Sequence, residues 1–380
     1  MLTTESRFII THAGSLPRAP ALAALHGRRS RGEAVPADEL DSAVRSATAE
    51  VIARQRSVGI DVGNDGEQAR ESFFTYVQHR MTGFGGSSHR PVMRDLLDHR
   101  DFLELARPRR ERMQVDLMHA PACIAEVAYG EGAELAAECA LVADAPFAET
   151  FMTAPSPGIV AAAMENRHYP TLEEYVRALA SALRTEYRAI VDGGLLLQID
   201  APDLAMERHV LFADRPLGEF LSFVELVVDA INEALAGVDP SRVRLHVCWG
   251  NYEGPHTHDV ELAAIQPLLY AAKVGALVVS MANARHAHEH RCFERHPLPD
   301  GMVLVTGVID TTSNYVEHPE VVAERLATVA RSVGDPRRVI AGTDCGFDTS
   351  AGIGDVAPSV VWAKLAALRA GADLASERLL

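Results

Sequence analysis

Short apolar runs alternate with longer amphipathic stretches along most of the chain. The apolar runs are nearly continuous, a pattern typical of strands that a parallel sheet buries on both faces. Eight runs fit this description: 8–11, 60–64, 150–153, 195–200, the run through His246 and Cys248, 276–281, 303–309 and 339–341. Helical periodicity occupies seven stretches: 38–59, 131–143, 171–192, 217–236, 260–274, 319–332 and 359–370. Eight strands separated by helices predict an α/β fold, the (β/α)8 TIM barrel.

The segment 87–148 interrupts this alternation. We interpret it as an insertion after the second strand, or as subunit-contact material, within a single domain of residues 1–380. Because this segment could contact a second subunit, a homo-oligomer is possible. In and beside the insertion we expect a glycine turn at 83–86, a hairpin at 123–129 and a solvated basic helix face at 107–112.

Composition and charge narrow the class of protein. The 380 residues are 48% hydrophobic and 23% charged, which is ordinary for a soluble globular chain, and the net charge of −16 disfavours nucleic acid and anionic membrane surfaces. Five cysteines are too few for a disulfide scaffold at this length. We see no secretory signal and no apolar run of roughly 20 residues, so we expect a cytoplasmic protein.

Polar side chains gather where the predicted strands end. In a (β/α)8 barrel the active site lies at that end of the strands. The side chains at these positions are His12, Asp65, Asp200, His246, Asn283, Asp310 and Asp344. This agreement between layout and chemistry places the candidate site at the mouth of the barrel.

His246 and Cys248 are two residues apart, so on an extended strand both side chains point to the same face. A second thiol, Cys345, follows the last predicted strand. One imidazole and two thiolates suit zinc, Zn²⁺. The alternative is a packed strand pair, because buried cysteine is common. The polar stretch 249–254 that follows the strand favours the metal.

With these residues in hand, the chain resembles the cobalamin-independent methionine synthase family, namely its catalytic C-terminal barrel and stand-alone relatives such as epoxyalkane:coenzyme M transferase. The resemblance covers nearly the whole chain. Its motifs are Thr-His-Ala-Gly-Ser-Leu-Pro-Arg at 11–18, Asn-Asp-Gly-Glu at 64–67, Gln-Ile-Asp at 198–200, His-Val-Cys at 246–248, Asn-Ala-Arg-His at 283–286, Gly-Val-Ile-Asp at 307–310 and Gly-Thr-Asp-Cys at 342–345. The resemblance implies a zinc ion that holds a thiol substrate as thiolate and presents it to an electrophilic carbon.

The sequence also departs from that family. Ser280 stands where the family has a glutamate ligand at the end of the sixth strand, and Ala201 replaces a glutamate that follows Asp200. The segment 310–314, Asp-Thr-Thr-Ser-Asn, lacks the family's histidine near the end of the seventh strand. These departures argue against homocysteine and a folate polyglutamate as the substrates.

Our leading hypothesis is a zinc-dependent methyl- or alkyltransferase that acts on a small thiol and an alkyl donor, both small molecules. The expected metal ligands are His246, Cys248 and Cys345. The expected substrate contacts are Ser15, Asp65, Glu67, Asp200, Trp249 and Asn283. The expected catalytic groups are His12, His256, His258 and Asp310, with one of the histidines as proton donor.

Two alternatives remain at this level. The first is a metal-free enzyme on the same barrel, of decarboxylase or lyase type, in which Ser280 marks the loss of the metal. The second is a zinc-storage or thiol-binding protein without turnover. His256 and His258 also have an alternative interpretation, as a loop pair that caps the following helix.

Overall fold

A parallel sheet of seven strands forms the centre of the molecule. The computed structural model describes residues 1–110 and 113–380, with the side chains of 108–110 left aside. Neighbouring strands are parallel throughout the sheet. Their order is β1 (Val62–Gly63), β4 (Glu149–Pro155), β5 (Leu196–Asp200), β6 (Val243–Val247), β7 (Ala276–Val279), β8 (Val303–Ile309) and β9 (Val339–Thr343).

The N-terminal segment joins the two outer strands of this sheet. Ile10 pairs with Ala341 of β9, and Thr11 pairs with Val62 of β1, both in parallel. The Thr11 amide donates to the Ala341 carbonyl at 2.9 Å, and the Val62 amide donates to the Ile10 carbonyl at 3.2 Å. The first predicted strand is thus present as two isolated bridges that close the sheet. The predicted TIM-barrel fold is confirmed.

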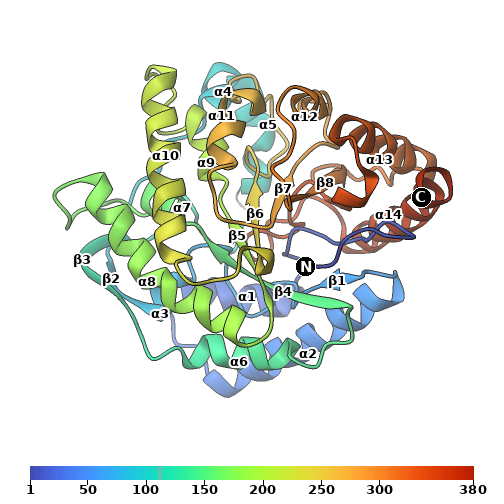
Figure 1. The fold of residues 1–380 in the computed structure, drawn as a ribbon. Coiled ribbons are helices and arrows are strands. Elements are labelled where there is room, and N and C mark those ends of the chain that lie inside the picture. Colours follow the sequence, from blue (N-terminus) through green and yellow to red (C-terminus); the bar gives the residue numbers. More distant parts are fainter. Residues whose placement is uncertain (111–112) are drawn as a thin grey trace.

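Helices surround the strands (Figure 1). Outside the insertion they include α1 (Pro20–Ser30), α2 (Ala37–Ser57), α7 (Pro157–Ala163), α8 (Leu172–Asp192), α10 (Leu217–Ala234), α11 (Leu262–Leu269), α13 (Pro319–Val333) and α14 (Pro358–Leu379). α8 begins at a capping box, in which the Thr171 hydroxyl accepts from the Glu174 amide at 3.1 Å. α11 is shorter than predicted because its end tightens into turns, where the amides of Ala271 and Ala272 donate only three residues back.

The barrel strands are buried on both faces, as their continuous apolar runs indicated. Every residue of β5, β6, β7, β8 and β9 is buried. Arg244 of β6 is a charged side chain buried among them. Its guanidinium donates to Gln198 Oε1 at 2.8 Å and to the His12 carbonyl at 2.7 Å, and stacks 4.0 Å from the Phe151 ring centroid. Arg244 therefore ties β6 to β5 and to the closing N-terminal segment.

The insertion folds as an antiparallel ribbon with two helices between its strands. β2 (Met81–Gly85) pairs with β3 (Ala122–Tyr129), and the chain between them forms α4 (Arg94–Asp98) and α5 (Arg100–Arg110). The predicted hairpin at 123–129 is wrong, because that segment is a single strand whose partner is β2. The predicted glycine turn is also wrong. Gly83 has a positive φ of 96° and lies at a register shift inside β2, so it forms an irregularity of the strand and not a turn.

Buried ion pairs fix this ribbon to α6 (Ala133–Val142) and α8. Arg80, the residue before β2, pairs with Glu138 of α6 and lies 3.0 Å from Glu186 of α8, and the Tyr129 hydroxyl of β3 donates to Glu186 at 2.6 Å. Removing either partner of such a buried pair is costly, since it leaves an uncompensated charge. The insertion is thus tied firmly to the barrel, while its role as a subunit contact stays a prediction.

Two further predictions concern exposed and apolar segments. Arg107 of α5 is exposed and pairs with Glu104, as a solvated face requires, whereas the rest of the basic stretch 107–112 lies outside the described side chains. Among the described residues, the helices lack any segment long and apolar enough to cross a membrane.

Candidate metal and substrate site

Three predicted ligands meet at the mouth of the barrel. His246 lies on β6, Cys248 follows its last residue, and Cys345 lies two residues beyond β9. One ligand atom from each lies within 4.8 Å of the other two, and all three side chains are buried. The two sulfurs are 4.0 Å apart, and both cysteines are free. We call these three residues the ligand group.

The His246 ring is oriented by a carboxylate behind it. Its Nδ1 lies 2.9 Å from Asp200 Oδ1, and the same oxygen accepts from Gln198 Nε2 at 2.7 Å. Its Nε2 is buried and has no hydrogen-bond partner among the described residues. A histidine that uses one nitrogen on a carboxylate and leaves the other unpaired is arranged as metal ligands usually are.

Charge is concentrated at the ligand group. Burial opposes protonation of His246, but the Asp200 carboxylate and the nearby Cys248 sulfur raise its pKa to about 10. The Cys345 thiol, and then the His246 imidazole against the effect of burial, hold the pKa of Cys248 well below its usual range. The same Cys248 sulfur, together with burial, raises the pKa of Cys345. The group therefore already favours one thiolate beside one cation.

Asp344, the residue before Cys345, is bound to the loop that follows β7. Its carboxylate accepts from the backbone amides of 281–283, each at 2.8 Å, and from the Asn283 side chain at 2.8 Å. The Ser280 hydroxyl donates to the Asp344 carbonyl at 2.6 Å. Ser280 is therefore engaged with the backbone, and it is not a member of the ligand group.

A cavity of about 240 Å³ opens on one side of the ligand group, and we call it the insertion chamber. Ser15, Glu67 and Asp200 line it together with the three ligands. Apolar side chains of the insertion form part of its remaining walls, among them Met93, Leu96, Phe102, Leu103, Leu117 and Met118.

Glu67 is an unusual residue within the insertion chamber. It is 2% exposed, its Oε1 accepts from the Thr153 hydroxyl at 3.1 Å, and its Oε2 has no partner among the described residues. Burial and the nearby Asp200 carboxylate raise its pKa to about 8. Its φ of 57° is in the left-handed region, where a non-glycine residue is strained. Asp65 supports this turn by accepting from the Glu67 amide at 2.9 Å.

A second cavity, of about 420 Å³, shares Cys248 and Cys345 with the chamber, and we call it the polar cavity. Trp249, Asn283 and Asp310 contribute to its walls. The Trp249 indole donates to the Val260 carbonyl at 2.7 Å and stacks on a histidine ring, so it stiffens the wall. Asp310 accepts from the amide and hydroxyl of the residue two positions on, at 3.0 and 2.9 Å.

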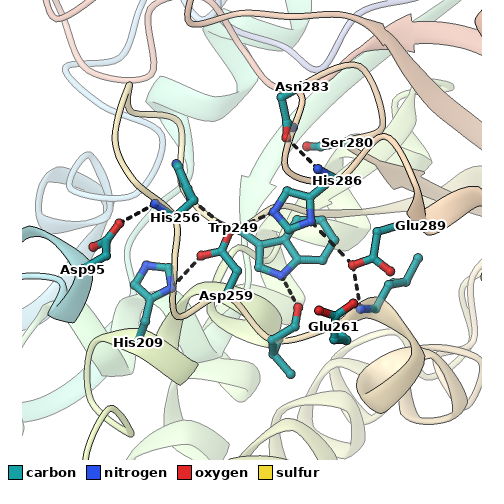
Figure 2. Close-up of polar contacts among 12 residues, drawn as sticks. Asp95, His209, Trp249, His256, Asp259, Glu261, Ser280, Asn283, His286 and Glu289 are labelled. Carbon is teal, nitrogen blue, oxygen red and sulfur yellow. Dashed lines mark hydrogen bonds and ion pairs between the residues drawn. The ribbon is translucent and has the colours of Figure 1, made fainter.

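A buried carboxylate surrounded by imidazoles supports the wall of the polar cavity (Figure 2). Asp259 lies 3.0 Å from His209, 3.0 Å from His256 and 2.8 Å from His286. The second nitrogen of His256 lies 3.1 Å from the Tyr252 carbonyl, so both of its ring nitrogens have partners. We call these four residues, Asp259 and the three histidines, the imidazole cluster. Sequence analysis missed it, because only folding brings His209 and His286 to Asp259.

Two predicted catalytic histidines lie away from both cavities. His12 is buried behind the barrel wall, where its Nε2 contacts Gln55 at 2.8 Å and burial lowers its pKa to about 4. His258 pairs with Asp98 of α4 at 2.7 Å near the surface. Asp65 likewise lines neither cavity. The structure brings the predicted ligands together with Ser15, Glu67 and Asp200, but not with these three residues.

The fold and the site define an α/β-barrel protein with a His/Cys/Cys group able to bind a metal. No family model matches the chain. The chain is 25% identical over 339 residues to methionine synthase of Sulfolobus acidocaldarius, covering 89% of this chain and 85% of that protein. It is 26% identical over 214 residues to 2-hydroxypropyl-CoM lyase of Xanthobacter autotrophicus, covering 49% of this chain and 52% of that one.

A solved structure agrees with the fold. The B12-independent methionine synthase from a Shewanella species, in complex with selenomethionine, superimposes with a TM-score of 0.75 at 19% identity and covers 98% of each chain. These sequence and structural relatives confirm the resemblance to the cobalamin-independent methionine synthase family.

Proposed function

We propose that the protein is a zinc-dependent enzyme that transfers a methyl or larger alkyl group to or from a small thiol. The observation that carries this proposal is the convergence of ligand atoms of His246, Cys248 and Cys345 within 4.8 Å, with the buried His246 Nε2 unpaired among the described residues. The names of the relatives, methionine synthase and 2-hydroxypropyl-CoM lyase, support chemistry at a thiol or thioether sulfur.

The residues present fit a zinc ion. Two sulfurs on one tetrahedral zinc, with bonds of about 2.3 Å, lie roughly 3.8 Å apart, close to the 4.0 Å between Cys248 and Cys345. Three protein ligands leave a coordination position free, as is typical of catalytic zinc sites. The two cavities meet at these sulfurs, so that position is open to small molecules.

Zinc held there would lower the pKa of a substrate thiol, so that the sulfur reacts as a thiolate at neutral pH. The residues of the chain perform the other tasks. Asp200 fixes the tautomer and the direction of His246, and Asp344, the residue before Cys345, is bound to the loop that follows β7. The apolar walls of the insertion chamber exclude water from the reacting carbon.

Glu67 is the proton donor in this proposal. Its raised pKa keeps the carboxyl protonated near neutral pH, and its unpaired Oε2 belongs to a side chain that lines the insertion chamber. A proton held there is available to an oxygen that leaves the reacting carbon, such as the oxygen of an opening epoxide. This assignment replaces His12 and His258, which line neither cavity.

Metal analysis of protein purified without chelator tests the proposal. We expect about one zinc per chain in the wild type and a large loss in Cys345→Ser. Cys292→Ser is the matched control, because Cys292 is also a buried free cysteine but lies outside the ligand group. Less than about 0.2 zinc per chain in the wild type, unchanged by Cys345→Ser, would defeat the proposal.

The thiol is tested next on cobalt-substituted protein. A sulfur-to-cobalt absorption band that grows when homocysteine, coenzyme M or glutathione is added would support thiol binding at the ligand group. Turnover with a methyl or epoxide donor, followed by mass spectrometry, then separates an enzyme from a thiol-binding protein. Turnover in the complete absence of metal would favour the metal-free alternative instead.

A further inference from the structure

The insertion chamber has an apolar lining that the transfer of a bare methyl group does not require. Much of this apolar lining comes from α4, α5 and the segments beside them, which lie between the strands of the β2–β3 ribbon. α4 is fastened over the ligand-bearing loop by Asp95, whose carboxylate accepts from the Tyr252 hydroxyl at 2.6 Å and from the His256 amide at 2.8 Å. Figure 2 shows the second of these contacts.

The charges in the chamber oppose an anionic ligand. Asp200 and Glu253 line it, and among its described lining residues Arg90 is the only cationic side chain besides His246. Arg90 is itself paired with the buried Glu207. An anionic group placed there would lose its hydration without gaining a free countercharge, which is unfavourable. Neutral apolar groups have no such penalty.

We infer that the insertion chamber binds the uncharged hydrocarbon body of one reactant, an aliphatic chain of several carbons or a phenyl ring, and that α4 and α5 set this preference. The inference rests on the proposed transfer at the ligand group, because the chamber ends at Cys248 and Cys345. The other reactant reaches the same sulfurs through the polar cavity, which has its own polar walls.

Binding of unreactive probes tests the chamber without requiring catalysis. The probes are propan-1-ol, hexan-1-ol, benzyl alcohol and hexanoate, titrated into the metal-loaded protein and followed by ligand-observed NMR. Each buried methylene contributes about a fourfold gain in affinity, so hexan-1-ol should bind roughly 60-fold more tightly than propan-1-ol. Hexanoate should bind at least about tenfold more weakly than hexan-1-ol. Equal affinities for the two alcohols would overturn the inference.

Variants on the insertion locate the binding. Leu103→Asp places a carboxylate in the chamber wall and should weaken hexan-1-ol binding about tenfold or more. Leu105→Asp is the matched control on the same helix, because Leu105 is 78% exposed and does not line the chamber. If Leu103→Asp fails to fold, Leu103→Ala serves instead and should weaken binding severalfold. If the Leu103 and Leu105 variants change the affinity for hexan-1-ol equally, the ligand does not bind in the insertion chamber.

Two substrate series then show which reactant carries the hydrocarbon body. The first compares ethanethiol with 1-hexanethiol, and the second compares propylene oxide with 1,2-epoxyhexane, each by kcat/KM. The series that gains with chain length identifies the occupant. Zinc-loaded protein that turns over short substrates and gains nothing with either series would overturn this inference alone. Protein that binds hexan-1-ol in the chamber but never binds zinc would overturn the proposed function alone.

Discussion

Replacing Glu67 by Gln tests whether the site keeps a buried, unpaired carboxyl at a cost to stability. The side chain is 2% exposed, and its Oε2 lacks a partner among the described residues. Gln has nearly the same size and needs the same backbone, so the strain at φ 57° is retained. It cannot ionise. The difference between the two proteins therefore reports the free energy of ionising this one group.

The magnitude follows from the pKa. Burial, then Asp200, raise the pKa of Glu67 from 4.5 to about 8, so the folded state binds the proton more tightly than the unfolded state between these pH values. The stability of the folded protein thus falls as pH rises from 4.5 to 8. A salt-bridged carboxylate has the opposite effect, because its lowered pKa makes stability rise with pH. At pH 7 the unfolded chain is ionised while most folded molecules remain protonated, and the penalty is about 3 kcal/mol at roughly 1.36 kcal/mol per pKa unit.

Urea unfolding of the metal-free proteins at pH 5 and pH 8 measures this penalty. We expect Glu67→Gln to be close to wild type at pH 5 and more stable by several kcal/mol at pH 8, with lower transfer activity. Glu71→Gln is a control of opposite sign. Although burial opposes it, the hydrogen bond with His79 lowers the pKa of Glu71, so the stabilisation by its carboxylate is fully present above pH 4.5. Glu71→Gln should therefore be less stable than wild type by the same amount at pH 5 and at pH 8. A stability difference for Glu67→Gln that is equal at both pH values would refute the reasoning.

Three further predictions concern the supports of the ligand group. Asp200→Asn should weaken zinc binding about 10- to 100-fold in chelator competition, because the His246 ring loses its orienting carboxylate, and an unchanged affinity would contradict this. Asp259→Asn should cost about 3 kcal/mol in urea unfolding. Although burial opposes it, Asp259 raises the pKa of two imidazoles in its cluster. The loss of unfolding free energy in Asp259→Asn should therefore be full below pH 6.5 and should shrink as pH rises through the raised pKa values of these two imidazoles. A loss that grows as pH rises would contradict the prediction. Gly307→Ala would place a Cβ 2.0 Å from Asp344 Oδ1, so it should destabilise by about 1–3 kcal/mol and reduce zinc content, while Gly218→Ala, with no atom within 4 Å, should do neither.

The barrel could be predicted because two independent signals agree along the chain. Continuous apolar runs mark strands buried on both faces, and helical periodicity fills the intervals between them. The β2–β3 ribbon could not be predicted in the same way. Gly83 has a positive φ, which a turn and an irregular strand both allow, and the sequence does not say which. The partner of β3 was thus hidden in a segment that looked like a turn.

The ligand group could be proposed from sequence because a barrel brings strand ends together. The direction of each side chain near a strand end could not be predicted from sequence. His12 follows two bridging residues and points to Gln55 of α2, which no spacing rule indicates. His256 and His258 are two apart, yet one contacts Asp259 and the other contacts Asp98. The walls of the insertion chamber depend on how the insertion folds back over the barrel, which its composition does not reveal.

Ser280 helps to hold the loop after β7 at the position where the resemblance to the methionine synthase family implies a glutamate. A ligand carboxylate would fix this loop through the metal. Here the loop is fixed without it, since the Ser280 hydroxyl and three consecutive backbone amides all bind Asp344. Asp344 immediately precedes Cys345, so the same contacts also place the second sulfur. In the proposed metal site, the three ligands would therefore keep their positions without a fourth protein ligand, which would leave more of the coordination sphere to the reactants.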